Sequence, residues 1–448
     1  MVACTMPPML FAGSAKPPAD KSNLSLTSPP MENMHKHILQ ILVALTLWSG
    51  TTARELPVVK PEEVGMSSAK LAKVDDVLKG FIAEKKLAGG IVAISRKGKI
   101  VHFGTYGKMD LERDKPMKPD SIFRIYSMSK AITTAAALIL FDEGKYELDD
   151  PVGKYIPEFK ELSVWRESQA EPAKRQMTVR DLMRHTSGLS YGFVGNGPVE
   201  KRYKKDKPID RAGSLSAMIK KLSDIPLAFE PGSKWQYSVS IDVLGRLVEI
   251  WSGKKLENFL TERICKPLDM KDTAFDVPKG KIDRFTANYG PSESGGLRLI
   301  DDPVKSRYLT KAGLASGGGG LVSTTRDYLR FLQMVLNGGE LHGTRILKKK
   351  TVRLMTRNQL PKKIMPIRIG PIPRVGVGFG LGFSTRVSMG PWDPGGKVGE
   401  YGWGGAASTH YWVSPKDELI VVTMEQVMPY SFMTEWAVKK LIYDAIEK

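Results

Sequence analysis

The chain is poor in cysteine and histidine: of 448 residues, two are cysteine and six are histidine. Cys4 would leave with an N-terminal leader, so Cys265 would remain alone. One cysteine excludes an intramolecular disulfide and a cysteine-rich metal site, and the histidines show no metal-ligand spacing. We therefore expect no metal and no other cofactor, and we expect Cys265 to be a small buried apolar residue.

Apolar runs long enough to cross a bilayer are also missing. Residues 38–48 are apolar but too short; basic residues precede them and small residues, 49–53, follow. This pattern is typical of an export signal that starts at Met34, is cut after Thr51–Ala53, and leaves a mature chain beginning near residue 54. Residues 1–55 are thus predicted to be a leader, and the protein periplasmic or secreted, with no stable membrane span after cleavage. A short membrane anchor is the alternative.

Acidic residues are outnumbered, 48 against 67 basic ones, which gives a formal charge of +19. The basic residues are scattered, without a long arginine-rich run or interleaved aromatic residues, so we expect no nucleic-acid partner. A generally basic exterior is the favoured interpretation, and attraction to anionic cell surfaces or polymers stays open.

The order of predicted elements indicates one sheet built from both ends of the chain. Strand pairs are predicted at 90–95 with 100–104 and at 408–413 with 419–423, and helices at 69–87 and from 434 onward. A chain of this length exceeds one hydrophobic core. We predict an α/β (α+β) fold, with an antiparallel sheet domain formed by residues 56–150 and 291–448 and a helical domain formed by residues 151–290.

Ser127 is the candidate nucleophile, because Lys130 lies one helical turn after it and an apolar helix is predicted from 131 to 141. The same Ser-x-x-Lys spacing occurs at Ser67 and Ser252. Ser67 is expected to cap a charged helix, and Ser252 to lie in the loop that ends one. Only Ser127 opens an apolar helix, where free backbone N–H groups would stabilise an oxyanion.

A serine hydroxyl needs a base, and lysine serves at neutral pH only when burial or neighbouring cations lower its pKa. Tyr237, in a loop before a predicted helix at 241–251, is the candidate for a second proton-transferring group. Most loop tyrosines are packing residues, so its position alone is weak support.

Five segments resemble the serine β-lactamase-like superfamily, which includes class C β-lactamases, D-alanyl-D-alanine carboxypeptidases and family VIII carboxylesterases. They are FRIYSMSK (123–130), LDDPV (148–152), LMRHTSGL (182–189), YS (237–238) and LVST (321–324). The resemblance covers nearly all of residues 57–445. It implies a mixed sheet flanked by helices, an active site between sheet and helical lobe, Ser127 as nucleophile, Lys130 as base or proton relay, and Tyr237 as general base or acid.

Two departures from the family pattern favour the esterase branch. The usual Tyr-x-Asn is Tyr237-Ser238-Val239, and the usual Lys-Thr-Gly is Trp403-Gly404-Gly405, as in family VIII carboxylesterases. Tryptophan offers an apolar wall where lysine would bind a substrate carboxylate, which favours neutral esters. Lys397 is an alternative third-motif residue. By the same resemblance, the amides of Ser127 and Ala406 form the oxyanion hole, and Tyr126 with residues 403–405 lines the substrate site.

A competing serine motif lies at Gly188–Gly192, which matches the G-x-S-x-G nucleophile elbow around Ser190. That elbow needs a strand before the serine and a helix after it, whereas a helix is predicted before Ser190 and a loop after it. We therefore interpret the match as accidental, although His410 lies late enough in the chain to complete a Ser-acid-His order.

Three functions are compatible with the sequence. The leading hypothesis is a serine carboxylesterase that hydrolyses neutral, short-chain esters through an acyl-enzyme. The second is a class C-like β-lactamase or D-alanyl-D-alanine peptidase, and the third is a non-catalytic penicillin-recognising or cell-wall-binding protein. The expected partner is a small-molecule ester, with β-lactams as possible side substrates; the oligomeric state stays open.

Overall fold

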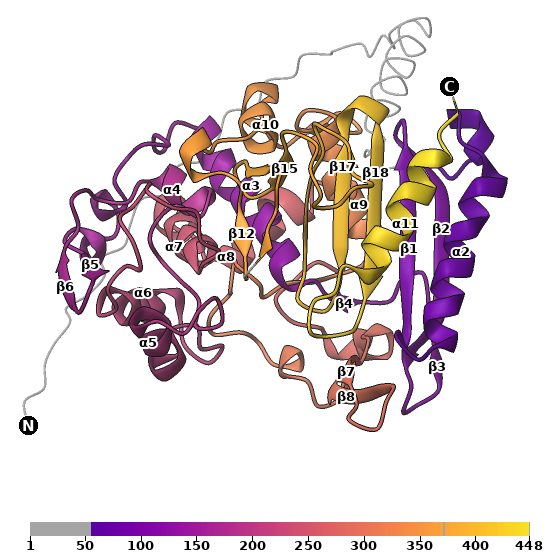
Figure 1. The fold of residues 1–448 in the computed structure, drawn as a ribbon, viewed down its shortest axis with the longest axis horizontal. Helices are drawn as coiled ribbons and strands as arrows, with labels where there is room; N and C mark the ends of the chain where they lie inside the picture. The colour runs from indigo at the N-terminus through magenta and orange to yellow at the C-terminus, as the bar shows by residue number, and fades with distance from the viewer. Residues whose placement is uncertain (1–54, 371, 448) are drawn as a thin grey trace, which may run out of the picture. The chain divides into compact units, whose positions relative to one another are not determined.

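The computed structural model describes residues 55–370 and 372–447. The predicted leader and its cleavage site lie outside them. Eight antiparallel strands form the main sheet, in the order β14-β15-β16-β17-β18-β1-β2-β3 (Figure 1). Their bounds are β1 Gly89–Arg96, β2 Lys99–Asp110, β3 Lys115–Pro116, β14 Val377–Phe379, β15 Ser384–Arg386, β16 Tyr401–Gly404, β17 His410–Ser414 and β18 Leu419–Glu425.

The centre of the sheet joins the two ends of the described chain, as predicted. β1 pairs with β18 in antiparallel register from Gly90↔Glu425 to Arg96↔Leu419. Successive residues of β1 face opposite sides: Val92 and Ile94 pack against α2 (Ser68–Ala83) and α11 (Met433–Asp444), which lie in front of the sheet in Figure 1. The predicted central antiparallel sheet with flanking helices is confirmed.

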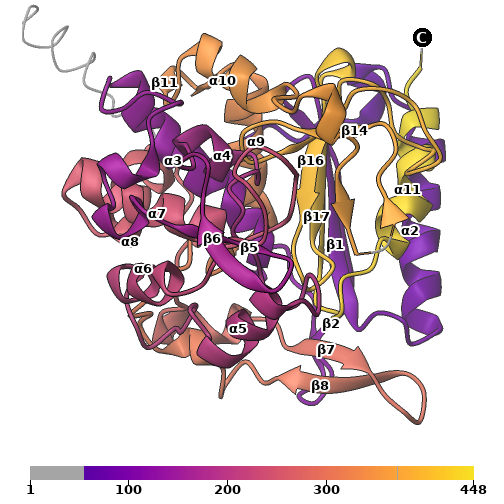
Figure 2. The ribbon, with the colours of Figure 1, turned by 60° about the vertical axis from the view of Figure 1, so that its left-hand side comes forward.

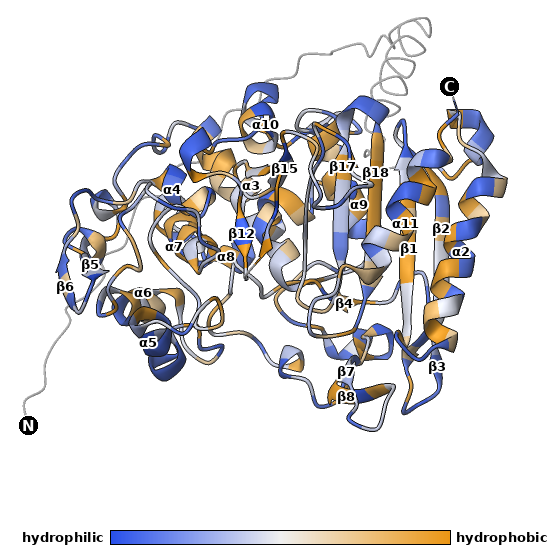
Figure 3. Ribbon diagram, in the orientation of Figure 1, coloured by the Kyte–Doolittle hydropathy of each residue, from blue (hydrophilic) through white to orange (hydrophobic). Residues whose placement is uncertain are grey.

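The opposite face of the sheet is covered by α9 (Thr325–Leu336) and the core around α3 (Ser129–Asp142). α3 is mainly apolar and is buried on all sides, since twelve consecutive residues from Ser129 to Leu140 are buried. Each large apolar side chain buried in this way contributes roughly 1.5–3 kcal/mol. Figure 3 shows the contrast between the apolar central strands and the two-faced helices α2 and α11.

The helical part of the chain begins after α3 and includes most residues between 151 and 290 (Figure 2). The described residues belong to one compact unit, 53–448, and the domain boundaries at 150/151 and 290/291 stay predictions. The helices here are α4 Val179–Met183, α5 Pro198–Asp206, α6 Leu215–Ser223, α7 Ser240–Ser252 and α8 Leu256–Leu260, with α10 Lys349–Thr356 farther along the chain.

Short two-stranded ladders complete the fold. They are β4 Phe123–Arg124 with β9 Val322–Ser323, β5 Ser163–Arg166 with β6 Gln169–Pro172, β7 Asn288–Pro291 with β8 Leu297–Asp301, β10 Glu340–Leu341 with β11 Thr344–Arg345, and β12 Arg368–Ile369 with β13 Ile372–Pro373. Among the described residues, no helix is long and apolar enough to cross a membrane.

A buried ionic cluster lies between α11 and the loop before β16. The Lys439 ammonium contacts Asp393 at 2.6 Å, Glu435 at 3.1 Å and Glu400 at 3.4 Å. Burial alone would raise the pKa of Glu435, but the charges of His410 and Lys439 outweigh burial and lower it to about 2. The cluster therefore depends on Lys439.

Replacing Lys439 with methionine should destabilise the protein by about 3–5 kcal/mol, because three carboxylates would lose their shared cation. Urea unfolding followed by circular dichroism measures this change. The neighbouring exposed Lys440, which pairs with Asp444 on the surface, is the matched control; Lys440→Met should cost less than about 1 kcal/mol. Equal losses for the two variants would contradict this view of the cluster.

Candidate active site

Ser127 lies at the start of α3, but not as its first residue. A short 3-10 helix, Tyr126–Met128, precedes α3 and carries the serine, which corrects the expected position by one short turn. Lys130, in the first turn of α3, is buried and donates a hydrogen bond to Ser127 Oγ at 3.3 Å. The structure thus brings together the two side chains that the spacing singled out.

Tyr237 reaches the same serine from the loop before α7. Its hydroxyl donates to Ser127 Oγ at 2.5 Å. The Lys130 ammonium lies 4.5 Å from the centre of the Tyr237 ring, a cation–π contact. Three groups able to exchange protons therefore meet at one oxygen, although 110 positions separate Tyr237 from Ser127 in the chain.

Trp403, in β16, forms a wall beside this triad. Its indole N–H points to the Tyr237 hydroxyl at 3.5 Å, and the two rings lie 5.4 Å apart. Lys397, the alternative third-motif residue, lies in the loop ahead of β16 and pairs with Asp417 at 3.1 Å. The position beside Tyr237 is therefore held by tryptophan.

The turn after β16 lies directly against the serine-bearing segment. A Cβ on Gly405 would come within 2.4 Å of the Ile125 carbonyl oxygen, so only glycine permits this approach. The Gly405 amide donates to Thr409 at 2.7 Å and is thus engaged, which leaves Ala406 as the next amide in the turn. Gly404 is equally confined, because a Cβ there would lie 2.5 Å from the Tyr430 ring.

Tyr126 differs from the other predicted site residues in its backbone. Its φ is +40°, in the left-handed region that tyrosine rarely adopts. Its hydroxyl accepts a hydrogen bond from the Asn288 side chain at 2.9 Å. Burial raises the pKa of Tyr126 above its ordinary value. This strained turn orients the residue immediately before Ser127.

Two residues that the sequence did not indicate hold Lys130. The ammonium donates to the Gly318 carbonyl at 2.5 Å, and the Gly318 amide donates to the Asp242 carboxylate at 3.0 Å. The Ser316 hydroxyl also donates to Asp242, at 2.5 Å. Burial raises the pKa of Asp242, and the Lys130 charge opposes that rise. The glycine run 317–320 was the available signal in the sequence.

The second-motif residues after Tyr237 turn into the core. Ser238 is buried and lies 3.1 Å from His185 Nδ1, and Val239 is buried as well. Burial, followed by the Lys130 charge, lowers the pKa of His185 well below its ordinary value. Val239, at the position of the missing asparagine, is therefore a packing residue. His185 is a neutral ring that packs against the Tyr237 loop, with 5.1 Å between the centres of the two rings.

The G-x-S-x-G match is accidental in structural terms. Ser190 follows α4 and a turn, not a strand, and its hydroxyl donates to Glu200 at 2.6 Å while accepting from Gln236. His410 binds the Tyr430 hydroxyl and pairs with Glu435 of α11. Ser67 caps α2, as expected, whereas Ser252 is the last residue of α7 and not part of the loop that follows it. Cys265 is buried, as expected.

Aromatic side chains line the approach to Ser127. Tyr191 and Phe193 stack at 4.8 Å, and the Tyr191 ring lies 5.3 Å from that of Tyr237. Phe193 is 70% exposed and so stands at the outer end of this row. Phe379 closes the row on the Trp403 side at 5.3 Å. The Tyr237 ring is therefore surrounded mainly by aromatic side chains.

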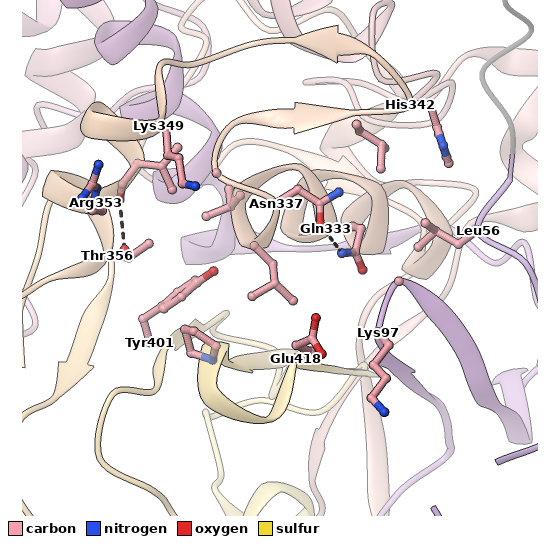
Figure 4. A pocket seen from close by; sticks show the side chains of 17 residues that line it. Leu56, Lys97, Gln333, Asn337, His342, Lys349, Arg353, Thr356, Tyr401 and Glu418 are labelled. Carbon is pink, nitrogen blue, oxygen red and sulfur yellow. Dashed lines mark hydrogen bonds between the residues drawn. The ribbon is translucent and has the colours of Figure 1, made fainter. Parts of the chain in front are cut away.

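A separate cavity of about 630 Å³ lies near the C-terminal end of α9 (Figure 4). Lys97, Lys349, Arg353 and Glu418 are among its lining residues. Ser127, Lys130 and Tyr237 are not among its lining residues.

In the part of the chain that the structure describes, no group of His, Cys, Asp or Glu side chains could hold a metal ion. The chemistry that the geometry supports is thus concentrated at Ser127.

Comparison with known proteins gives the family. A family model described as β-lactamase matches residues 74–442. The chain belongs to the β-lactamase family of serine hydrolases. Protein Rv1367c of Mycobacterium tuberculosis is 34% identical over 356 residues, covering 77% of this chain and 86% of its own length. Esterase EstB of Burkholderia gladioli is 32% identical over 292 residues, covering 61% of this chain and 72% of EstB.

Among solved structures, EstCE1, described as a hydrolase with promiscuous acyltransferase activity, superposes with a TM-score of 0.70 at 25% identity. The match covers 84% of this chain and 99% of EstCE1. The β-lactamase-like fold predicted from the motifs is therefore confirmed, as is membership among serine hydrolases that have esterase relatives.

Proposed function

We propose that the protein is a family VIII-type serine carboxylesterase that hydrolyses neutral, short-chain esters through an acyl-enzyme. The observation that carries this proposal is the hydrogen bonding of Ser127 Oγ by Tyr237 and Lys130 beside Trp403. The β-lactamase family match and the similarity to EstB support a hydrolytic serine. The tryptophan in place of a substrate-binding lysine supports a neutral substrate.

In the proposed reaction, the Tyr237–Lys130 pair starts with one basic site free, as a phenolate or a neutral amine, and takes the proton of Ser127 Oγ while this oxygen attacks the ester carbonyl. The amides of Ser127 and Ala406 stabilise the oxyanion. The pair then returns the proton to the leaving alcohol, and the acyl-enzyme forms. Water attacks this ester in a second, equivalent step and releases the acid, which restores the Ser127 hydroxyl.

A panel of p-nitrophenyl esters of increasing acyl length, measured beside the cephalosporin nitrocefin, tests this proposal. We expect turnover of the short esters to exceed turnover of nitrocefin, and Ser127→Ala to lose both activities. Nitrocefin turnover above ester turnover would favour the β-lactamase alternative instead.

We also propose that the mature protein is exported to the periplasm or secreted. Cell fractionation tests this, and retention in the cytoplasm would refute it.

Acyl transfer to an alcohol is a second candidate. EstCE1 is described as a hydrolase with acyltransferase activity, and the row of aromatic side chains beside Tyr237 would favour an alcohol over water as acceptor. Adding short alcohols to the ester assay should then yield the transesterified product at the expense of the free acid. If free acid alone forms, the protein is a simple hydrolase.

Replacing Gly318 with alanine should lower kcat about 10²-fold, because misplaced catalytic groups cost rates of this order. A Cβ at Gly318 would lie 2.3 Å from Asp242, which would displace the carbonyl that binds Lys130. Steady-state kinetics on p-nitrophenyl acetate measure the effect. Gly280→Ala is the matched control, since a Cβ there meets nothing within 4 Å. Equal activity of the two variants would show that Gly318 does not position Lys130.

A further inference from the structure

One stretch of the sequence carries most of the excess positive charge. Between Glu340 and Asp393 there is no acidic residue but eleven basic ones, against a net charge of +19 for the whole chain. They are Arg345, Lys348, Lys349, Lys350, Arg353, Arg357, Lys362, Lys363, Arg368, Arg374 and Arg386. The charge is therefore not evenly distributed, and this stretch includes the β12–β13 hairpin.

Exposed apolar side chains are found in the same stretch. Ile372 is 59% exposed, Met389 55% and Val375 39%. Val375 and Met389 come from adjacent segments, because the amides of Val387 and Ser388 donate to the Gly376 carbonyl at 2.8 and 3.2 Å. Apolar side chains exposed in a group mark a contact surface more often than single ones do.

Two tryptophans extend this group toward α11. Trp436 is 45% exposed and packs edge-on against Trp392 at 5.3 Å. The Arg374 guanidinium, next in sequence to Val375, lies 4.9 Å from the Trp392 ring centre. We name Ile372, Val375, Met389, Trp392 and Trp436 the apolar patch.

Three cations in the basic stretch, Arg374, Lys362 and Lys363, form no ion pair within the described part of the chain, whereas Arg386 beside Trp392 pairs with Asp393. Arg374 contacts three aromatic rings, those of Trp392, Trp403 and Phe432, and no carboxylate lies within ion-pair distance of it among the described residues. Lys362 and Lys363, just ahead of β12, are exposed, and no carboxylate of residues 55–370 or 372–447 pairs with them. An anionic partner would thus find basic groups that are not already neutralised.

We propose that the apolar patch and its flanking cations bind the surface of an anionic phospholipid bilayer. Exposed isoleucine, valine and methionine would enter the boundary of the acyl chains, and tryptophan is favoured at the level of the headgroups. Each lysine or arginine near an anionic membrane adds about 1 kcal/mol of attraction. The mixture of apolar groups, tryptophan and unpaired cations fits this partner better than a protein surface, which would have to supply carboxylates between its apolar contacts.

This surface adjoins the wall of the catalytic site. The guanidinium of Arg374 lies 5.3 Å from the Trp403 ring centre, and Trp403 contacts Tyr237. Esters dissolved in the lipid would then reach Ser127 from the bilayer side; of the statements about this surface, only this one rests on the proposed esterase function. The membrane binding itself is independent of the reaction.

Co-flotation of the full-length chain with vesicles tests the proposal. The triple variant Ile372→Ser, Met389→Ser and Trp436→Ser should bind about 10-fold more weakly to vesicles of phosphatidylcholine with about one quarter phosphatidylglycerol. Leu111→Ser, which removes an exposed apolar side chain in the turn between β2 and β3, is the control and should bind like the wild type. All variants keep residues 38–48, the apolar run of the predicted leader, so any vesicle binding that the leader contributes is the same in every variant.

Charge is tested separately, with variants that are expected to fold. Lys362→Gln with Lys363→Gln should weaken binding to the anionic vesicles about 10-fold or more and leave binding to pure phosphatidylcholine unchanged. Lys201→Gln with Lys205→Gln removes the same charge from α5 and should have little effect. Hydrolysis of soluble p-nitrophenyl acetate, measured without vesicles, should stay unchanged in every variant and reports on the proposed function alone.

Wild-type binding by both the triple and the lysine variants would overturn the proposal. It would also be overturned if the triple variant dissociated a dimer in size-exclusion chromatography while binding vesicles normally, because a second copy would then cover the patch. If the triple variant failed to unfold cooperatively, the lysine pair and its α5 control would decide alone.

Discussion

Replacement of Ser127 with alanine should abolish ester hydrolysis, lowering kcat/KM by about 10⁴-fold or more, as loss of a nucleophile does in other serine hydrolases. The reason is geometric: Ser127 Oγ is the atom on which the hydroxyl of Tyr237 and the ammonium of Lys130 converge. Steady-state kinetics on p-nitrophenyl acetate measure the loss. Alanine at this partly buried position removes one oxygen and should leave the unfolding temperature unchanged.

Ser190→Ala is the matched control, since it removes the serine of the competing G-x-S-x-G motif. Ser190 is buried and hydrogen-bonded to Glu200 and Gln236, so its loss should affect stability more than turnover. We expect Ser190→Ala to keep activity within about tenfold of wild type while losing about 1–3 kcal/mol of stability. Loss of activity in Ser190→Ala together with retention in Ser127→Ala would reverse the assignment.

Replacement of Tyr237 with phenylalanine should lower kcat by about 10²–10⁴-fold, the usual contribution of a positioned acid–base group. The ring would stay packed against Trp403 and Tyr191, and only the hydroxyl that donates to Ser127 would be lost. KM for a small ester should change little, because the walls of the site remain. Burst kinetics would show whether formation or hydrolysis of the acyl-enzyme slows more.

Tyr191→Phe is the comparison for this variant. Its hydroxyl lies in the same site but donates to Asp242 at 3.4 Å and not to the serine. We expect less than about a tenfold loss, since this hydrogen bond is long and acts only on the turn that holds Lys130. If both tyrosine variants lost activity equally, the hydroxyl of Tyr237 would have no special part in proton transfer.

The parts of the fold that could be predicted from sequence are those set by local pattern. Apolar, β-rich runs on both sides of the turns at 96–99 and 414–417 predicted both central hairpins, and the apolar run after Lys130 predicted buried α3. The family resemblance then supplied the pairing of distant motifs. Trp403 was found in this way, and Tyr237, a weak candidate from its loop position alone, gained its support from the same resemblance.

The parts that could not be predicted depend on contacts between distant segments. Lys130 binds a carbonyl 188 positions away, and a backbone oxygen carries no sequence signal of its own. Asp242 looked like any acidic residue near a helix start, yet it is buried and fixes the Gly318 turn. Tyr191 and Phe193 lie at the end of a motif that was correctly rejected, and their role in lining the site became visible only in three dimensions.

Mass spectrometry of a trapped acyl-enzyme would show directly which serine is the nucleophile. The full-length protein would be quenched in acid during turnover of a slowly hydrolysed ester, digested, and searched for the acyl group. We expect the added mass on the peptide containing Ser127, no adduct in Ser127→Ala, and accumulation of the acyl-enzyme when Tyr237→Phe slows deacylation. An adduct on Ser190, or turnover with no covalent intermediate on any serine, would contradict it.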